Sequence, residues 1–427
     1  MKKKYILGID CGTSLIKVMI VNRDADQVGF GSTEIMTLHP KEGYAEQDPV
    51  ALWDSVYNLI LKTLSDNNIL LGQIAAIGIT NQRSSTIVWN KKTGIPYSNM
   101  VLWFDKRAGS LSEKLSGILG TETVERVGMY TIPNTSAMLL TWLLQNDPSV
   151  KEGVEKGEAL FGTVNSWLLW KLTDGEVHCS DIANMSVTQF QNAKELKYDT
   201  KVLDQLDIPK EILPEIKGTG EIYGLTSEKL FFGERIPIAG MLGDQQAAVL
   251  GQGCIFSGMV KATFGTGCFC VMNVGKEYNS PANGLFSPVL LGSKKDATYS
   301  LEGFFEIEGD RDDEQILRDI AFQVRYIIKS MEDVSKHSIQ ILRIDGGMSE
   351  NEYLCQFLAD IIGIPVERPA TGEATGLGAV YQAGLTIGFW NFVEETASLW
   401  KLDKRFEPKI SISERDQLYS NWLRRNR

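Results

Sequence analysis

The sequence has few residues that could bind a metal. It contains three histidines and six cysteines among 427 residues. The cysteines form no CxxC pair, and His39, His178 and His337 do not have metal-ligand spacing, which argues against a structural zinc site. We therefore expect the thiols to be free and at least half-buried, in a reducing compartment.

A signal-peptide pattern and a basic surface are also missing. The basic start, residues 1–4, is followed by an apolar stretch that Asp10 ends after a few residues, so we interpret it as the first strand of a cytoplasmic protein. The net charge of -11 argues against a nucleic-acid or anionic-membrane partner. Partners of these two kinds are therefore the first to be excluded.

What is present is the composition of a globular protein with two domains. A chain of 427 residues, 43% of them apolar and 23% charged, exceeds what one hydrophobic core usually supports. Short apolar runs alternate with longer amphipathic ones, which predicts an α/β fold. The pattern predicts strands over residues 17–21, 74–80, 85–89, 236–239 and 342–345, and helices over residues 51–64, 110–115 and 351–362.

A glycine-threonine turn between two apolar runs occurs twice, in residues 6–14 and 260–269. Each copy predicts a β-hairpin whose turn presents backbone N–H groups and a threonine hydroxyl to a bound anion. Two such turns facing one cleft would hold a polyphosphate. The repeat also divides the chain, and we predict an N-terminal domain over residues 1–250 and a C-terminal domain over residues 251–427.

A lone carboxylate, Asp244, follows the small-residue turn 240–243 and precedes a helical run. A carboxylate that a bound hydroxyl group can reach is suited to take its proton as a general base. An aspartate at this position is also a good helix N-cap. The residues alone leave both interpretations open.

Several motifs in one order resemble the FGGY family of carbohydrate kinases, and the glycerol kinase branch is the nearest. The resemblance implies two ribonuclease-H-like domains of the actin and hexokinase type, with an active site in the cleft between them that uses ATP and Mg²⁺. It rests on residues 10–14 with 17, 78–83, 162–163, 167–173, 243–247, 264–269, 345–347, 367–369 and 374–379.

The resemblance also implies roles for individual residues. Asp244 would be the general base, and Asp10 would hold Mg²⁺ through water, although Asp10 could also be a turn-forming aspartate. The polyol-binding residues would be Arg83, Ser84, Trp103, Asn134, Asp244, Gln245 and Phe269. The nucleotide-binding residues would be Gly12, Thr13, Ser14, Lys17, Gly265, Thr266, Gly267, Gly346, Gly347 and Asn351, with a plain strand-to-helix turn as the alternative for residues 346–347.

Two polar positions depart from the glycerol kinase pattern. Ser84 stands where that branch has a glutamate, and Asn134 stands where it has a tyrosine after Pro133. Shorter polar groups leave more room, and mismatches in a site that reads hydroxyls change specificity strongly. We therefore expect that a larger polyol or a ketopentose could fit instead.

The C-terminal half is shorter than the family pattern. Segments 299–303 and 316–323 are normally separated by several tens of residues that include a helix contacting adenine, whereas here they are almost adjacent. We expect a nucleotide domain shortened around residues 306–315, by a true loss or by omission of residues from the sequence, and the second explanation is favoured. Glycines 372, 376 and 378 are interpreted as tight helix packing near the cleft.

Three functions follow as hypotheses. The first is ATP-dependent phosphorylation of a primary hydroxyl of a small polyol or sugar, and the second is a kinase for xylulose or a related ketopentose. The third is an actin-like or chaperone-like ATPase module, against which residues 81–83 and 243–246 count because a switch protein needs no polyol pocket. We expect a cytoplasmic homo-oligomer, a dimer.

Overall fold

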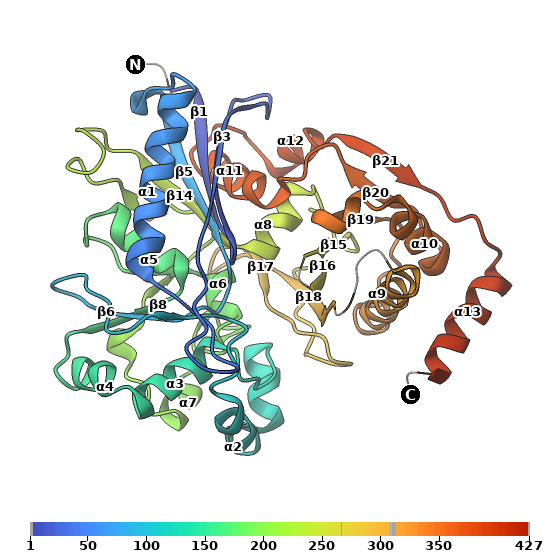
Figure 1. Ribbon diagram of the computed structural model, residues 1–427, viewed down its shortest axis with the longest axis horizontal. Helices are drawn as coiled ribbons and strands as arrows, with labels where there is room; N and C mark the ends of the chain where they lie inside the picture. Colours follow the sequence, from blue (N-terminus) through green and yellow to red (C-terminus); the bar gives the residue numbers. More distant parts are fainter. Residues whose placement is uncertain (1–2, 266, 308, 310–312, 426–427) are drawn as a thin grey trace.

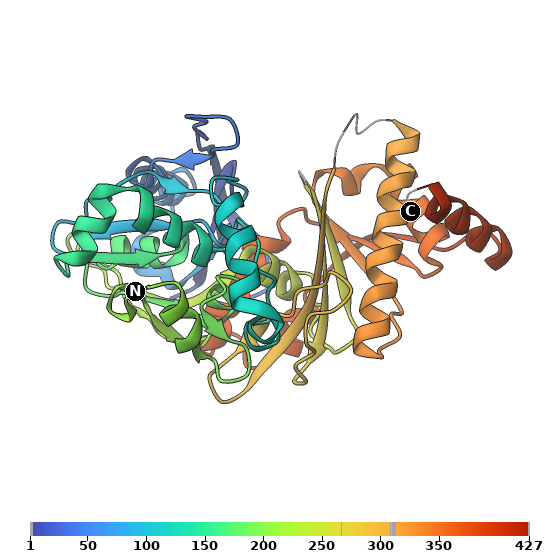
Figure 2. The ribbon, with the colours of Figure 1, turned by 90° about the horizontal axis from the view of Figure 1, so that it is seen from below.

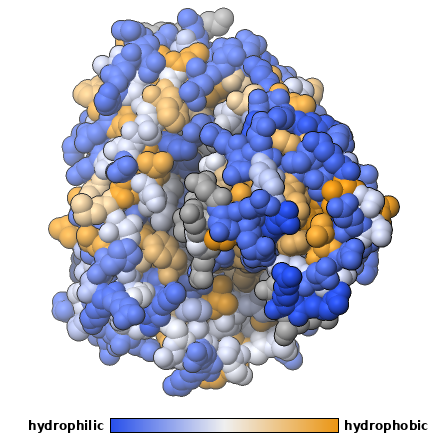
Figure 3. Space-filling model, turned by 45° about the vertical axis from the view of Figure 1, so that its right-hand side comes forward, coloured by the Kyte–Doolittle hydropathy of each residue, from blue (hydrophilic) through white to orange (hydrophobic). Residues whose placement is uncertain are grey.

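The computed structural model describes residues 3–265, 267–307, 309 and 313–425. Two large mixed sheets, each at the centre of one α/β unit, account for most of the fold, and the units lie side by side (Figures 1 and 2). The surface is hollowed between the two units (Figure 3). The α/β fold with two units and a cleft between them agrees with the sequence prediction.

The first sheet has the strand order β13-β14-β5-β1-β2-β3. β1, β2 and β3 pair antiparallel in sequence, while β5 and β14 join β1 in parallel. Helix α1 packs on β2 and β3, and helix α11 packs on β1, β5 and β14. The bounds are β1 Tyr5–Cys11, β2 Leu15–Val21, β3 Gln27–Glu34, β5 Ile74–Asn81, β13 Gly224–Leu225, β14 Pro237–Gly243, α1 Pro49–Asp66 and α11 Ala374–Thr386.

The second sheet repeats this pattern with the order β17-β18-β16-β15-β19-β20-β21. β15, β16 and β18 pair antiparallel, and β19 and β20 continue in parallel from β15. The β1–β2 and β15–β16 pairs are the two hairpins predicted from the glycine-threonine repeat. The bounds are β15 Val260–Phe264, β16 Gly267–Gly275, β17 Val289–Gly292, β18 Ala297–Glu306, β19 Leu342–Asp345, β20 Val366–Pro369 and β21 Leu402–Phe406.

Short two-stranded sheets and further helices complete the two units. The sheets are β4 Glu46–Gln47 with β7 Met100–Val101, β6 Ile87–Asn90 with β8 Ala159–Gly162, β9 Cys179–Asp181 with β12 Glu215–Lys217, and β10 Gln191–Asn192 with β11 Lys197–Tyr198. The helices are α2 Gly109–Val127, α3 Ser136–Asn146, α4 Pro148–Glu155, α5 Val164–Leu172, α6 Ile182–Ser186, α7 Thr200–Gln205, α8 Asp244–Gly251, α9 Glu314–Ser335, α10 Glu352–Ile362, α12 Val393–Ser398 and α13 Ile412–Arg425.

Two expectations from composition can be compared with the described residues. All six cysteines are free and buried, as expected. Across the described helices, none combines the length and the apolar character needed to cross a bilayer.

Helices α8 and α11 cross in close contact where the two units meet (Figure 1). A Cβ atom added to Gly378 would lie 1.9 Å from the Ala247 carbonyl oxygen, and one added to Gly251 would lie 1.8 Å from the Ala374 carbonyl oxygen. Only glycine permits this backbone approach. Gly378 therefore serves helix packing as the sequence predicted, whereas Gly372 precedes α11 and has nothing within 4 Å of an added Cβ, so the prediction was wrong for that glycine.

Gly378→Ala is expected to lower the free energy of unfolding by roughly 1–3 kcal/mol, because the added methyl group forces α8 and α11 apart. This loss should exceed the gain of about 1 kcal/mol that alanine brings inside a helix. Gly372→Ala is the matched control, since nothing lies within 4 Å of its added Cβ. Denaturant unfolding measures both variants, and equal stability would contradict the packing role.

Candidate active site

A cavity of about 150 Å³ lies between the two units and brings most of the predicted substrate residues together. The first unit contributes the β1–β2 turn, the segment after β5 and the start of α8, and the second unit contributes β16 and β18. The lining residues are Thr13, Arg83, Ser84, Trp103, Met129, Ile132, Asn134, Thr135, Val187, Asp244, Phe269, Phe286, Glu302 and Phe304.

Asp244 is the first residue of α8 and faces this cavity. Its side chain is 30% exposed, and its Oδ1 accepts a hydrogen bond of 2.7 Å from the Gln245 amide. Burial raises the pKa of Asp244, while Arg83 and Lys261 oppose the rise. A carboxylate with a raised pKa, reachable from a cavity, is suited to accept a proton.

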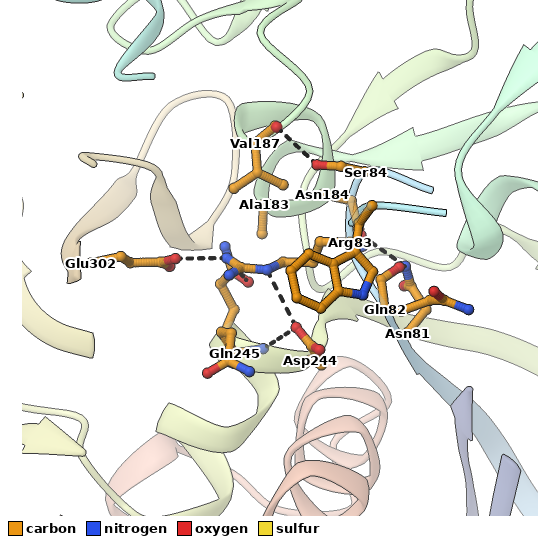
Figure 4. A network of polar contacts seen from close by, with 12 residues as sticks. Asn81, Gln82, Arg83, Ser84, Ala183, Asn184, Val187, Asp244, Gln245 and Glu302 are labelled. Atoms are coloured by element: carbon orange, nitrogen blue, oxygen red, sulfur yellow. Dashed lines mark hydrogen bonds and ion pairs between the residues drawn. The ribbon is translucent and has the colours of Figure 1, made fainter. Parts of the chain in front are cut away.

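Arg83 forms ion pairs with two carboxylates, and the pair with Glu302 joins the two units (Figure 4). Its Nη1 lies 2.8 Å from Glu302 Oε2 on β18, and its Nε lies 3.3 Å from Asp244 Oδ1. Nη1 also donates to Gln246 Oε1 at 3.3 Å. The Arg83 and Glu302 side chains are 11% and 5% exposed, so this pair is largely shielded from water, whereas Asp244 remains open to the cavity. In such surroundings the guanidinium is held in one orientation.

Two predicted substrate residues have other hydrogen bonds. Gln245 does not line the cavity, because its Oε1 accepts a hydrogen bond from the buried Lys261 ammonium. Ser84 lines the cavity, but its hydroxyl donates to the Val187 carbonyl oxygen at 3.0 Å, as Figure 4 shows. The positive φ of Ser84, 62°, sets this side-chain direction.

Aromatic side chains form one wall of the cavity. The Phe269 and Phe304 rings lie 4.2 Å apart, and Trp103 packs edge-on against both at 6.0 and 6.1 Å. The Trp103 Nε1 donates to the Thr13 hydroxyl at 3.0 Å, which ties this wall to the first hairpin turn. Trp103 and Phe269, two of the predicted polyol-binding residues, therefore lie together in the wall of the cavity.

In each hairpin turn, one glycine amide donates a hydrogen bond within the turn itself. Gly12 N–H donates to the Leu15 carbonyl oxygen at 3.0 Å, and Gly265 N–H donates to the Gly267 carbonyl oxygen at 2.9 Å. These two amides close their turns and do not point free toward an anion, which differs from the sequence expectation. In the part of the chain described, nothing accepts the amide hydrogens of Thr13 and Ser14. Thr266 lies outside the described residues.

Lys17, predicted near the phosphates, forms an ion pair with Glu373. Its Nζ lies 2.8 and 3.0 Å from the two Glu373 carboxylate oxygens, and the two side chains are 26% and 24% exposed. Glu373 directly precedes α11. To bind a phosphate, Lys17 must either keep its ion pair with Glu373 and interact with both groups, or break that ion pair.

The remaining nucleotide candidates lie at the end of β19. Gly346 has a φ of 86°, and a Cβ there would lie 2.3 Å from the Phe264 carbonyl oxygen, so the turn requires glycine. Gly347 begins the short helix Gly347–Glu350. Asn351 caps α10, with its Oδ1 accepting from the Leu354 amide at 3.0 Å, so its amide group stays available as a donor.

Asp10 lies on β1 beside Lys17 on β2. Burial raises its pKa to about 7; Lys17 opposes the rise, and Asp244 and Glu373 add to it. The described residues contain no group of three acidic, histidine or cysteine side chains that could hold a metal ion. Mg²⁺ typically needs only one or two carboxylates beside phosphates and water, and Asp10 near Asp244 fits that donor set.

Sequence reasoning missed two charged residues of the site. Glu302 lies in the middle of β18 and Lys261 is the charged residue of β15, and they are 4% and 0% exposed. Burial lowers the pKa of Lys261, while Asp345, Asp244 and Glu302 oppose the effect. The available signal was a charged residue within a strand pattern. Charged side chains are rarely buried without a partner, so such a residue indicates an ion pair or a site.

Comparisons with known proteins agree with this fold. Models of the N-terminal and C-terminal domains of the FGGY family of carbohydrate kinases match residues 5–251 and 316–387. A glycerol kinase of Desulforamulus reducens is 36% identical over 487 aligned positions, covering 99% of this chain and 97% of that protein. Glycerol kinase 2 of Thermotoga maritima is 37% identical over 483 positions, covering 98% and 97%.

Solved structures show the same fold. Plasmodium falciparum glycerol kinase with ADP has a TM-score of 0.91 at 28% identity, covering 99% of this chain and 98% of that one. A ligand-bound xylulose kinase of Lactobacillus acidophilus has a TM-score of 0.84 at 18% identity, covering 99% and 97%. The 487 positions aligned with the Desulforamulus protein exceed the 427 residues here, so that relative carries residues that this chain lacks.

Proposed function

The chain belongs to the FGGY family of carbohydrate kinases, and from this premise we propose that it transfers the γ-phosphoryl group of ATP to a primary hydroxyl of a small polyol, as a glycerol-kinase-like enzyme. The observation that carries the proposal is the position of Asp244, whose carboxylate lines a cavity shared by both units and is held by Arg83. This arrangement offers a base beside a fixed cation.

The chain's own residues would orient the acceptor and move its proton. Asp244 would accept the hydroxyl proton, and Arg83 would hold a neighbouring hydroxyl by charged hydrogen bonds. Thr13 and Ser14 would donate to phosphate oxygens from the first turn. Mg²⁺, held by Asp10 through water, would neutralise charge on the transferring phosphoryl group when bound.

A coupled assay of ADP release tests the proposal over glycerol, erythritol, xylitol, xylulose and ribulose. We expect ADP release that depends on an added acceptor, with the polyols favoured over the ketopentoses. Preference for xylulose would support the second hypothesis, because the smaller side chains of Ser84 and Asn134 leave room for a ketopentose. Turnover that no acceptor changes would contradict both kinase hypotheses. The cytoplasmic location, the dimer and the domain division at residue 250 stay predictions.

A further inference from the structure

The cavity at Asp244 is lined by one charged cluster and by a larger set of apolar side chains. Arg83 holds the cluster together through ion pairs to Asp244 and Glu302. The other lining side chains are largely apolar and come from separate segments of both units: Met129, Ile132, Val187, Phe269, Phe286 and Phe304. An acceptor with hydroxyl groups along its whole length would direct some of them at hydrocarbon.

Two lining residues, Ser84 and Thr135, already donate their hydroxyl hydrogens within the protein. The Ser84 hydroxyl donates to the Val187 carbonyl oxygen at 3.0 Å, and the Thr135 hydroxyl donates to Gln189 Oε1 at 3.1 Å. Among the described residues, the Asn134 side chain has no hydrogen-bond partner, so it can serve one substrate group. The Ser84 and Thr135 oxygens can still accept a hydrogen bond, but other substrate hydroxyls would lie against apolar side chains, where an unpartnered polar group is unfavourable.

The size of the cavity limits the acceptor as well. Its volume is about 150 Å³, and an apolar cavity of about that volume accommodates a benzene-sized molecule of about six heavy atoms. If the two hydroxyl-bearing carbons of an acceptor bind at Asp244 and Arg83, the cavity has room left for a short hydrocarbon end against the apolar side chains.

We propose that the preferred acceptor is a small terminal vicinal diol with a short alkyl end in place of further hydroxyl groups. This inference rests on the proposed kinase function and names the substrate class of the same site. The terminal phosphoryl group of ATP passes to the primary hydroxyl oxygen, ADP leaves, and the hydroxyl proton goes to Asp244. The alkyl end packs against Ile132, Phe286 and Phe304.

The matched acceptors butane-1,2-diol and butane-1,2,4-triol test this selectivity, because they differ by one hydroxyl at the far end. We expect kcat/KM for the diol to exceed that for the triol by about tenfold or more, the range in which an apolar pocket discriminates. Calorimetric titration of the nucleotide-free protein should rank the two in the same order. Equal values, or a preference for the triol, would overturn the inference.

Ile132→Thr adds a hydroxyl to the apolar wall and should bring the diol-to-triol ratio close to one. Ile222→Thr is the matched control, because Ile222 is 54% exposed and does not line the cavity. Circular dichroism of both variants shows whether they are folded. If the Ile132→Thr variant does not fold, the Ile132→Ser variant and the titrations of the wild-type protein test the role of the apolar wall instead. An unchanged ratio in a folded Ile132 variant would overturn the role of this wall.

The outcomes separate the two proposals. If the enzyme releases ADP with glycerol or a sugar but does not favour the diol, the inference fails and the kinase function stands. If no alcohol stimulates ADP release, the proposed function fails and the inference fails with it.

Discussion

Asp244→Asn is expected to lower kcat by roughly 10²-fold to 10⁴-fold, the usual contribution of general acid–base catalysis, with acceptor affinity largely retained. Asparagine keeps the size of the side chain and can still accept the hydrogen bond from the Gln245 amide, but it cannot take a proton. Steady-state and pre-steady-state ADP release measure the effect. A variant with wild-type kcat would show that the base is another residue.

Glu302→Gln is the comparison variant for this test. Glu302 also lies against Arg83 in the cavity, so its replacement changes the same charge network without removing the proposed base. We expect a smaller loss of kcat than for Asp244→Asn. Equal losses would indicate that both variants act by releasing Arg83, and not by removing a base.

The pH dependence of the wild-type enzyme should report the same carboxylate. Because burial raises the pKa of Asp244, the carboxylate becomes protonated at a higher pH than an ordinary aspartate, so kcat should fall with acidification earlier than the usual aspartate range. The loss of kcat occurs on the acid side because the base accepts a proton only in its deprotonated form. A kcat that stays constant down to the ordinary aspartate pKa would contradict this assignment.

Local sequence patterns were enough to predict the frame of the fold. The glycine-threonine repeat located both hairpins, and the predicted strands 74–80 and 342–345 match β5 Ile74–Asn81 and β19 Leu342–Asp345. The predicted strand 85–89 begins only at Ile87, because Ser84 turns the chain with a positive φ. The helix predicted over residues 110–115 runs to Val127 and is interrupted at Gly120, whose φ of 66° lies outside helical values. Its weak apolar periodicity explains why the sequence indicated only the first turns.

The charge pairs of the site could not be predicted, since they join residues that are distant in sequence. Lys17 meets Glu373 because α11 packs on the first sheet, and Arg83 meets Glu302 because β18 of the second sheet lies beside the segment after β5. The sequence likewise suggested that the turn glycines offer free amides, whereas Gly12 and Gly265 use theirs to close the turns. A motif predicts which residue types gather at a site, but competition between neighbouring partners decides which groups stay free for a ligand.

Arg83→Gln should damage both stability and acceptor use. Glu302 is 5% exposed at its side chain, and losing the guanidinium leaves this carboxylate buried without a cation. Breaking a buried pair in this way costs roughly 3–5 kcal/mol of unfolding free energy. Asp244 loses a neighbour that lowers its pKa, so the acid limb of the kcat profile should also move to higher pH. Denaturant unfolding and pH-rate measurements test the two effects.

The double variant Arg83→Gln with Glu302→Gln separates these contributions. Neutralising Glu302 removes the unpaired charge, so we expect most of the lost stability to return. The affinity for the acceptor should not return, because the guanidinium that would hold a hydroxyl is still absent. If the double variant is as unstable as Arg83→Gln alone, the buried carboxylate is not the source of the loss. If it recovers wild-type kcat/KM, Arg83 holds the two units together and does not bind the acceptor.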